Sequence, residues 1–277
     1  MNRRAVAAIA RKDMRGITSN VQIWLPMLII PVIFCIIMPL VLGIAIRSGD
    51  VKDLEDVEPL LSMVERMPDS SLKRAIDSLT TLSQRMAYLM FNHMFAPMFL
   101  IVPIMAASTI SADSFVGEKE RGTMESLLLA PVDIMSMFMG KVLAALVPTL
   151  VLSIASFVVY GLVANIACWK LFGGIFFPHV NWLPLMALVM PAASVLAIAI
   201  NVLISAKTST FQAAYQISAF LVFPVVGLMI AQVSGVMLMD TIAFTVLGAV
   251  LLALDWVLIR IIVSRLDRSR MFESQVK

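Results

Sequence analysis

The residue types that most often do chemistry are scarce and scattered in this chain. Its 277 residues include two histidines, His93 and His179, and two cysteines, Cys35 and Cys168. No HExxH, GxSxG or CxxC motif occurs, and no apolar segment contains a pair of glutamates. We therefore expect no catalytic centre and no metal site, and we interpret both cysteines as small apolar packing residues.

A GxxxxGK[ST] phosphate-binding loop is also absent from the sequence. The chain therefore cannot bind and hydrolyse a nucleotide by the P-loop route. Any work drawn from ATP must come from another subunit, and we expect no cofactor bound by this chain itself.

Asp255 stands inside an apolar segment, where an ionisable side chain is costly and often functional. Counted from Asp240 at 1.5 Å per residue, it lies about 22 Å along the helix, in its inner half. Arg260 is about 140° further around the same helix, so the two side chains do not face each other. Two interpretations stay open: a hydrogen bond or salt bridge to a neighbouring helix, or a coupling site for an ion.

Small polar residues form stripes on two other apolar segments. They are Thr149, Ser153, Ser156 and Tyr160 on the first, and Ser194, Asn201 and Ser205 on the second. Such side chains let membrane helices approach and hydrogen-bond one another, so helix packing is one interpretation and a substrate-lining role is the other.

A polar segment between two apolar ones carries the most specific pattern. Gly122 should end a helix, Thr123 can cap a new one, Glu125 sits in the first turn of that helix, and Pro131 ends it. The resulting two-turn helix exposes Leu127, Leu128 and Leu129 although it lies outside the apolar segments. Because so short a helix is unstable alone in water, it needs a surface to dock on.

This segment resembles the permease subunits of type 2 ABC transporters. Their pattern, Phe-x-x-Glu-Lys/Arg-x-x-Gly-Thr-x-Glu-x-Leu-Leu-x-x-Pro, is matched from Phe115 to Pro131, and the Gly140-Lys141 pair and the Lys12–Pro31 stretch also fit. The resemblance implies a coupling helix seated in a separate cytoplasmic ATPase, which would use ATP and Mg²⁺. It further implies a dimer, with itself or a related permease. The residues that would contact or shape the ATPase interface are Glu118, Lys119, Arg121, Gly122, Thr123, Glu125, Leu127 and Leu128.

The elements that must position these residues are membrane helices. Hydrophobic residues make up 60% of the chain and charged residues 14%, and the uncharged windows exceed the ~20 residues that cross a bilayer. We predict an all-α membrane protein with six spans and no nucleic-acid partner, because net charge is only +3 and no basic tract occurs. The expected spans are Ile23–Ile46, Phe91–Ser111, Phe138–Ala164, Leu183–Ser205, Tyr215–Met237 and Thr241–Val263.

The distribution of Lys and Arg places both termini in the cytoplasm, because the segments on that side carry about twice as many of them. The cytoplasmic parts are then an N-terminal helix (1–20), the coupling loop (112–137) and a tail (264–277). Residues 47–90 form an external helical segment, either a cap on the bilayer or a ligand-recruiting surface. Its second helix, from Leu72 to Met86, should run straight into the second span.

The N-terminal helix has two unlike faces, with Arg4, Arg11 and Arg15 on one and Val6, Ile9, Ala10 and Ile17 on the other. It should lie flat on the inner membrane surface, either as an anchor on anionic lipid or gripped by a cytoplasmic partner. Asp13 within the apolar face favours the partner.

Together these features predict one permease domain of an ATP-driven exporter in the plasma membrane of a prokaryote. The apolar spans favour an amphipathic or apolar cargo such as a drug, lipid or peptide, and sodium is also compatible with the resemblance. The alternative is an ion-coupled secondary carrier that works alone through Asp255. An intramembrane enzyme would need converging His, Glu or Cys residues, which the sequence does not provide.

Overall fold

The computed structural model describes residues 2–48, 71–123, 132–234, 237 and 239–265, and in these residues every regular element is a helix. Six of the helices are long and apolar enough to cross a membrane, as predicted. They run as Ile23–Ser48, Leu82–Glu120, Ile134–Ala167, Trp182–Ser205, Phe211–Val233 and Thr241–Ser264. We refer to them as spans 1 to 6.

Several spans are continuous helices that change type along their length. Span 1 contains α2 (Val21–Pro31), η1 (Val32–Ile37) and α3 (Met38–Ser48), and span 3 is α11 (Ile134–Ala167). Span 2 contains α6 (Leu82–Leu89), η3 (Met90–Met94), α7 (Phe95–Phe99), α8 (Ile101–Ala112), η4 (Asp113–Gly117) and α9 (Glu118–Glu120). Span 4 contains α13 (Trp182–Pro184), η5 (Leu185–Val189) and α14 (Met190–Ser205). Span 5 contains α15 (Phe211–Ser218), η6 (Ala219–Val222) and α16 (Phe223–Val233), and span 6 belongs to α17 (Thr241–Arg265).

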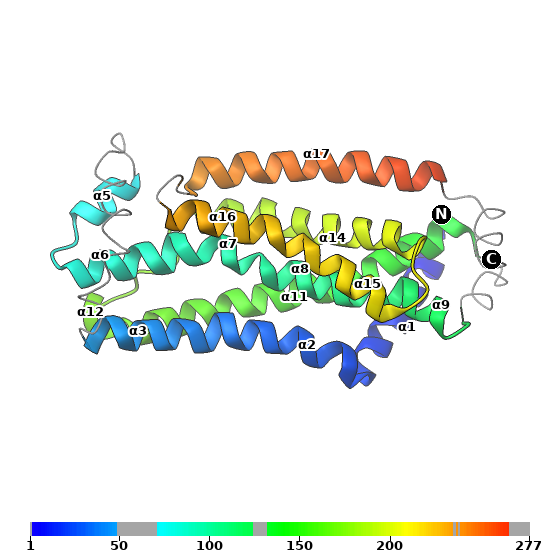
Figure 1. The fold of residues 1–277 in the computed structure, drawn as a ribbon, viewed down its shortest axis with the longest axis horizontal. Coiled ribbons are helices and arrows are strands. Elements are labelled where there is room, and N and C mark those ends of the chain that lie inside the picture. The colour runs from blue at the N-terminus through cyan, green and yellow to red at the C-terminus, as the bar shows by residue number, and fades with distance from the viewer. Residues whose placement is uncertain (1, 49–70, 124–131, 235–236, 238, 266–277) are drawn as a thin grey trace.

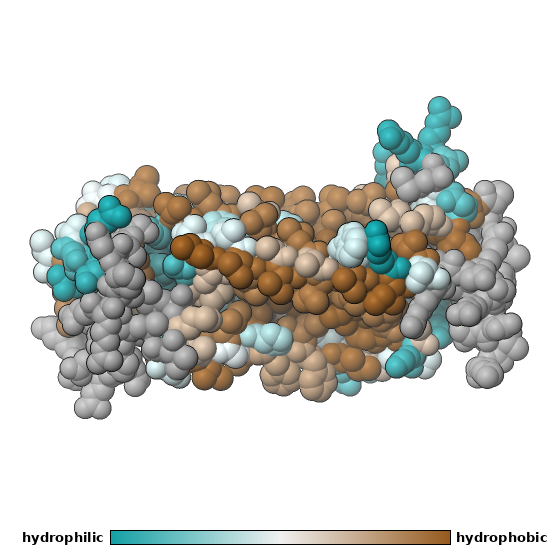
Figure 2. Space-filling model, turned by 90° about the horizontal axis from the view of Figure 1, so that it is seen from above, coloured by the Kyte–Doolittle hydropathy of each residue, from teal (hydrophilic) through white to brown (hydrophobic). Residues whose placement is uncertain are grey.

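The six spans form one elongated bundle, with short helices at each end (Figure 1). The α1 end carries α1 (Arg3–Ser19) and α9, and the α5 end carries α5 (Ser71–Asp77) and α12 (Trp169–Phe172). The bundle surface between the two ends is largely apolar, and polar residues gather at the ends (Figure 2). Side chains such as Val151, Leu162 and Val250 are more than half exposed there, which is the surface that hydrocarbon requires.

Span 2 is the centre of the bundle. Of its most apolar window, 78% is buried, against 17% in spans 5 and 6. The helix continues beyond the predicted end of the apolar span at Ser111 to Glu120, in agreement with the helix end predicted at Gly122. Polar residues in this extension are paired with other helices, so the helix continues where hydropathy alone suggested a loop.

The structure changes two further expectations. The helix predicted from Leu72 to Met86 is broken between α5 and α6, where Thr81 caps α6 and Gln84 completes a capping box. In addition, the apolar face of α1, which we expected on the membrane surface, packs against α11 of the same chain. The division of faces itself is confirmed, since Val6, Ile9, Ala10 and Ile17 are buried and Arg4, Arg11 and Arg15 are exposed.

Candidate functional site: an ion cluster beside the predicted coupling loop

The centre of the candidate site is a buried ion pair between spans 2 and 3. Lys141 in α11 is 1% exposed, and its Nζ donates to Oε2 of Glu118 at 2.5 Å and to the Ser114 carbonyl oxygen at 2.6 Å. The ammonium also lies 5.6 Å from the centroid of the Phe115 ring. An isolated buried ammonium would be very costly, so these contacts explain how Lys141 is tolerated inside the protein.

The N-terminal helix supplies the remaining charges. Oδ2 of Asp13 in α1 accepts from the Ser114 hydroxyl at 2.9 Å and lies 3.5 Å from Nζ of Lys141. Lys12 in α1 donates to Oε1 of Glu118 at 2.7 Å. We call Lys12, Asp13, Ser114, Glu118 and Lys141 the ion cluster. Its two ammonium groups balance its two carboxylates, so the cluster that joins these three helices has no net charge.

Lys12 differs from Lys141 in its exposure to solvent. Its side chain is 59% exposed, against 1% for Lys141. Partial burial alone would lower the pKa of Lys12, but the hydrogen bond and charge of Glu118, together with Asp13, outweigh this effect and raise it. Lys12 is therefore bound as a cation at the rim of the cluster, and Lys141 lies inside it.

Local sequence explains why α1 reaches the cluster. Asp133 caps α11 by accepting from the Ser136 backbone N–H at 3.0 Å, and the Ser136 hydroxyl accepts from the Asn2 backbone N–H at 2.8 Å. Seven residues after the cap, α1 crosses α11 at Gly140. A Cβ atom there would lie 2.9 Å from Cβ of Ile9, so only glycine allows this close approach. The Gly140-Lys141 pair thus provides the crossing point and the central charge.

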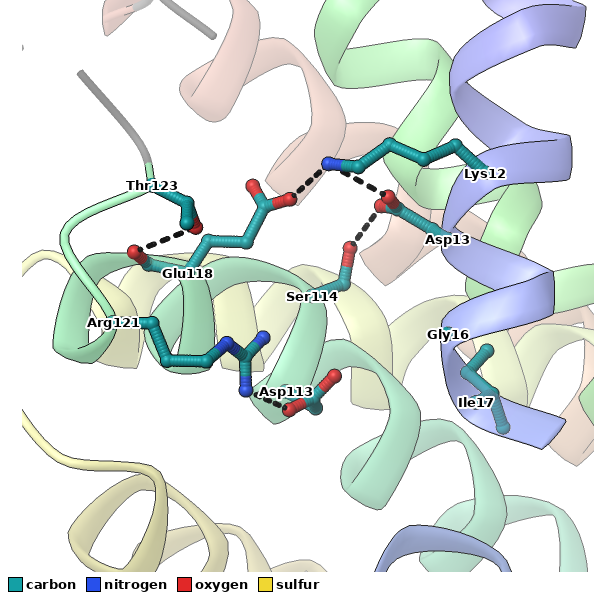
Figure 3. Close-up of a pocket in the computed structure, with 9 residues that line it drawn as sticks. All are labelled: Lys12, Asp13, Gly16, Ile17, Asp113, Ser114, Glu118, Arg121 and Thr123. Carbon is teal, nitrogen blue, oxygen red and sulfur yellow. Dashed lines mark hydrogen bonds and ion pairs between the residues drawn. The ribbon is translucent and has the colours of Figure 1, made fainter. Parts of the chain in front are cut away.

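A cavity of about 220 Å³ opens beside the ion cluster, between α1 and the end of span 2 (Figure 3). On its span 2 side, Arg121 donates to Oδ1 of Asp113 at 2.9 Å, and this hydrogen bond raises the pKa of Arg121. The lining carries charges of both signs. It comprises Lys12, Asp13, Gly16, Ile17, Asp113, Ser114, Glu118, Arg121 and Thr123.

The predicted coupling loop begins directly after these residues. Gly122 has a φ of +68°, a left-handed conformation that ends the helix as predicted. The Thr123 backbone N–H and hydroxyl both donate to the Glu118 carbonyl oxygen, at 3.0 and 3.2 Å. Residues 124–131, with the predicted Glu125, Leu127 and Leu128, lie outside the described residues.

The predicted interface residues before the loop separate into different environments. Glu118 is 5% exposed, so it shapes the end of span 2 rather than offering a charge to a partner. The Lys119 ammonium lies 3.5 Å from the Thr208 carbonyl oxygen, and Glu120 accepts from the Phe211 backbone N–H at 2.8 Å. The end of span 2 therefore contacts the start of span 5 as well as α1 and span 3.

The other predicted polar residues lie inside the bundle. Thr149, Ser153 and Ser156 are all buried. Asn201 accepts from the Ser218 hydroxyl at 2.6 Å, which links span 4 to span 5 and supports a packing role for Asn201. Asp255 is 4% exposed, and no described residue donates a hydrogen bond to either of its carboxylate oxygens.

Sequence reasoning missed a polar cluster at the α5 end. The backbone carbonyls of Phe91, Asn92 and His93 in the π-helical η3 accept from Tyr160, Trp182 and Gln232 respectively, at 2.8, 3.0 and 3.3 Å. A π-helical turn disturbs the regular backbone bonding, so its carbonyls can bind side chains from other spans. The only sequence signal was the Asn-His pair within an apolar segment.

The two histidines also meet in this cluster, although they are 86 positions apart in the sequence. The centroids of the His93 and His179 rings are 5.7 Å apart, and Nδ1 of His179 lies 2.6 Å from the Tyr88 hydroxyl. Burial lowers the pKa of His179. Within the described part of the chain, no group of three or more His, Cys, Asp or Glu residues could hold a metal ion.

Comparison with known proteins identifies a family. A family model described as ABC-2 family transporter protein matches residues 7–264, which include all six spans, the ion cluster and most of α1. No curated protein and no solved structure matches the chain.

Proposed function

The chain belongs to the ABC-2 transporter family, and we propose that it is the membrane subunit of an ATP-driven exporter. Membership of this family supports a membrane transport subunit of an ABC transporter, and it implies association with an ABC ATPase. We further propose a cytoplasmic α1 end, residence in the plasma membrane of a prokaryote, and a dimer of this permease with itself or a related one.

The ion cluster carries the proposal for the mechanism. Glu118, Lys141 and Asp13 join span 2, span 3 and α1 within a few residues of Thr123, where the predicted coupling loop starts. Glu120 adds the start of span 5 through its bond to Phe211. A movement of the loop would therefore be passed to four helices together. We propose that closure of the ATPase on ATP and Mg²⁺ displaces the loop, and that these contacts transmit the displacement as a rigid-body shift.

We propose an amphipathic or apolar cargo, because the surfaces of the spans are largely apolar and the described spans contain few charges in their central parts. The ion-coupled carrier that the sequence also allowed would need no ATPase. Family membership favours the ATP-driven exporter over this carrier, since the family is that of membrane transport subunits of ABC transporters.

The test is copurification of a P-loop ATPase with the permease from its native membranes in mild detergent. We would compare the wild type with Leu128→Glu in the predicted coupling helix. Ile175→Glu is the matched control, because Ile175 is 80% exposed at the α5 end and receives the same acidic side chain. We expect the ATPase with the wild type and the control but not with Leu128→Glu. Absence of an ATPase from the wild type, or its retention by Leu128→Glu, contradicts the proposed coupling.

A further inference from the structure

An apolar cavity lies within the bundle, far from the ion cluster. It has a volume of about 110 Å³, and it is formed by residues of spans 2, 4, 5 and 6, including Ile104, Ala193, Ala197, Leu228, Leu247 and Leu251. Every residue that lines it is apolar. In Figure 1, α14 is visible between α16 and α17, and these three helices with α8 provide most of the lining.

The position of the cavity along the bundle is near the middle of the membrane-spanning part. Leu247 and Leu251 are the seventh and eleventh residues of α17, which begins at Thr241. At 1.5 Å per residue they lie about 9–15 Å from the start of the helix. Water is therefore a poor occupant on two grounds, the depth of the cavity and its apolar lining.

Asp255 does not line the cavity but stands one helical turn beyond Leu251, which does. Leu251 and Asp255 are four residues apart in α17 and so lie on the same helix face. Asp255 is 4% exposed, and neither of its oxygens has a hydrogen-bond donor among the described residues. Arg260 does not pair with Asp255, because its guanidinium lies 3.9 Å from the centroid of the Trp256 ring, on the exposed side of the helix.

A buried carboxyl group without a partner is costly, and a cation at hydrogen-bond distance would remove most of that cost. An apolar cavity close to a carboxylate is complementary to a molecule that has a hydrocarbon part and a positively charged group. We propose that this cavity and Asp255 form a binding site for an amphipathic amine, with its hydrocarbon part in the cavity and its ammonium on Asp255. The inference rests on the proposed function in one respect only, that such an amine is a cargo.

The dimensions of the site define a suitable probe. An engineered protein cavity of about 150 Å³ binds benzene. This cavity is smaller, about 110 Å³, but it is not closed, so it accepts a short alkyl chain or part of an aromatic ring. One helical turn, about 5.4 Å, separates the cavity lining from Asp255. The ammonium of 3-phenylpropan-1-amine is separated from its ring by a comparable distance, and 3-phenylpropan-1-ol is its uncharged counterpart.

The experiment measures equilibrium binding of both probes to the purified permease in lipid nanodiscs, without ATPase, with empty nanodiscs subtracted. We expect the wild type to bind the amine at least about tenfold more tightly than the alcohol. Asp255→Asn keeps the shape but not the charge, so it should bind the two probes equally. Ala197→Phe fills the cavity and should abolish binding of both, and Ile175→Glu at the α5 end should bind like the wild type.

Equal binding of amine and alcohol by the wild type overturns the proposal even if a variant fails to fold. Retention of the preference by folded Asp255→Asn, or unchanged binding by folded Ala197→Phe, overturns it as well. Because no ATPase is present, the result is independent of the copurification test. Loss of ATPase association with intact amine binding would reject the proposed function alone, and the reverse result would reject only this site.

Discussion

Replacement of Lys141 by methionine tests whether the ion cluster holds the α1 end together. The substitution keeps an unbranched side chain of similar length but removes the charge. Among the residues that the structure describes, it leaves Lys12 as the one ammonium that binds the buried Glu118 carboxylate. Because Lys141 is 1% exposed, the relevant comparison is the loss of one partner from a buried ion pair. Such a loss costs about 3–5 kcal/mol.

Replacement of Lys12 by methionine is the matched comparison. Lys12 binds the same carboxylate of Glu118, but 59% of its side chain is exposed, so solvent screens the interaction. We expect at most about 1 kcal/mol of destabilisation. If two-state arithmetic holds, Lys141→Met should lower the midpoint of thermal unfolding by roughly 6–20 °C, and Lys12→Met should lower it by no more than about 4 °C.

The assay can use the two free cysteines, Cys35 and Cys168, which are both buried and therefore react with a thiol dye only on unfolding. A second substitution, Glu118→Gln, separates loss of charge balance from loss of packing. It removes the carboxylate left in excess, so the double variant should be more stable than Lys141→Met alone, with a coupling of about 0.5–3 kcal/mol. Equal effects of Lys12→Met and Lys141→Met, or no rescue by Glu118→Gln, would refute the reasoning.

Three further predictions concern other parts of the structure. Gly140→Ala places a methyl group 2.9 Å from Cβ of Ile9, so it should cost about 1–3 kcal/mol and increase proteolysis of α1; adding Ile9→Ala should recover little of the loss, because alanine keeps the Cβ atom that the new methyl group meets. Gly122→Ala forces a side chain into a left-handed conformation, which should cost about 1–2 kcal/mol in thermal unfolding, and Gly122→Asn should cost less; equal costs would contradict the role assigned to φ. Burial lowers the pKa of His179, so the folded state holds the neutral ring. The contribution of His179 to the free energy of unfolding is therefore full above its ordinary pKa near 6.5, and it decreases as the pH falls below that value. His179→Gln should therefore lose less stability than the wild type between pH 7.5 and pH 5.5, and parallel losses in the two proteins would show that another group titrates.

The structure also changes which substitutions can test an ATPase interface. Reversal of the Glu118 charge would place a third ammonium-type charge beside Lys12 and Lys141 and remove a buried carboxylate. Its main effect would be on folding, and a lost partner could not be assigned to the interface. Substitutions in residues 124–131, or of the exposed Thr123, avoid this problem.

Local patterns in the amino-acid sequence predict the class of the protein and most of its helices. The six spans follow from long uncharged apolar segments, because the bilayer imposes a length and an apolar surface on each helix independently of its neighbours. The two faces of α1 and the helix end at Gly122 are equally local, since they depend on helical periodicity and on one backbone conformation. The family also followed from a local pattern, and the match over residues 7–264 confirms it.

The partners of the charged residues depend on how the helices pack in the folded chain. Lys141 and Lys12 are both basic residues near the ends of apolar segments, and nothing in their local sequence distinguishes the buried one from the exposed one. The difference arises because α1 crosses α11 at Gly140 and brings Asp13 and Lys12 beside the end of span 2. Ion pairs between residues more than 100 positions apart depend on how helices pack.

The same reason applies to the α5 end and to Asp255. His93 and His179 meet because span 2 and the segment before span 4 pack together. The π-helical carbonyls that accept from Tyr160, Trp182 and Gln232 have no distinct sequence pattern. The sequence alone allowed two partners for Asp255, a side chain on a neighbouring helix or a transported ion. Packing placed it against apolar surfaces near an apolar cavity, because the helix face that carries Asp255 also carries Leu247 and Leu251. Hydropathy and periodicity determined each helix, and side-chain packing between helices determined the environment of each charge.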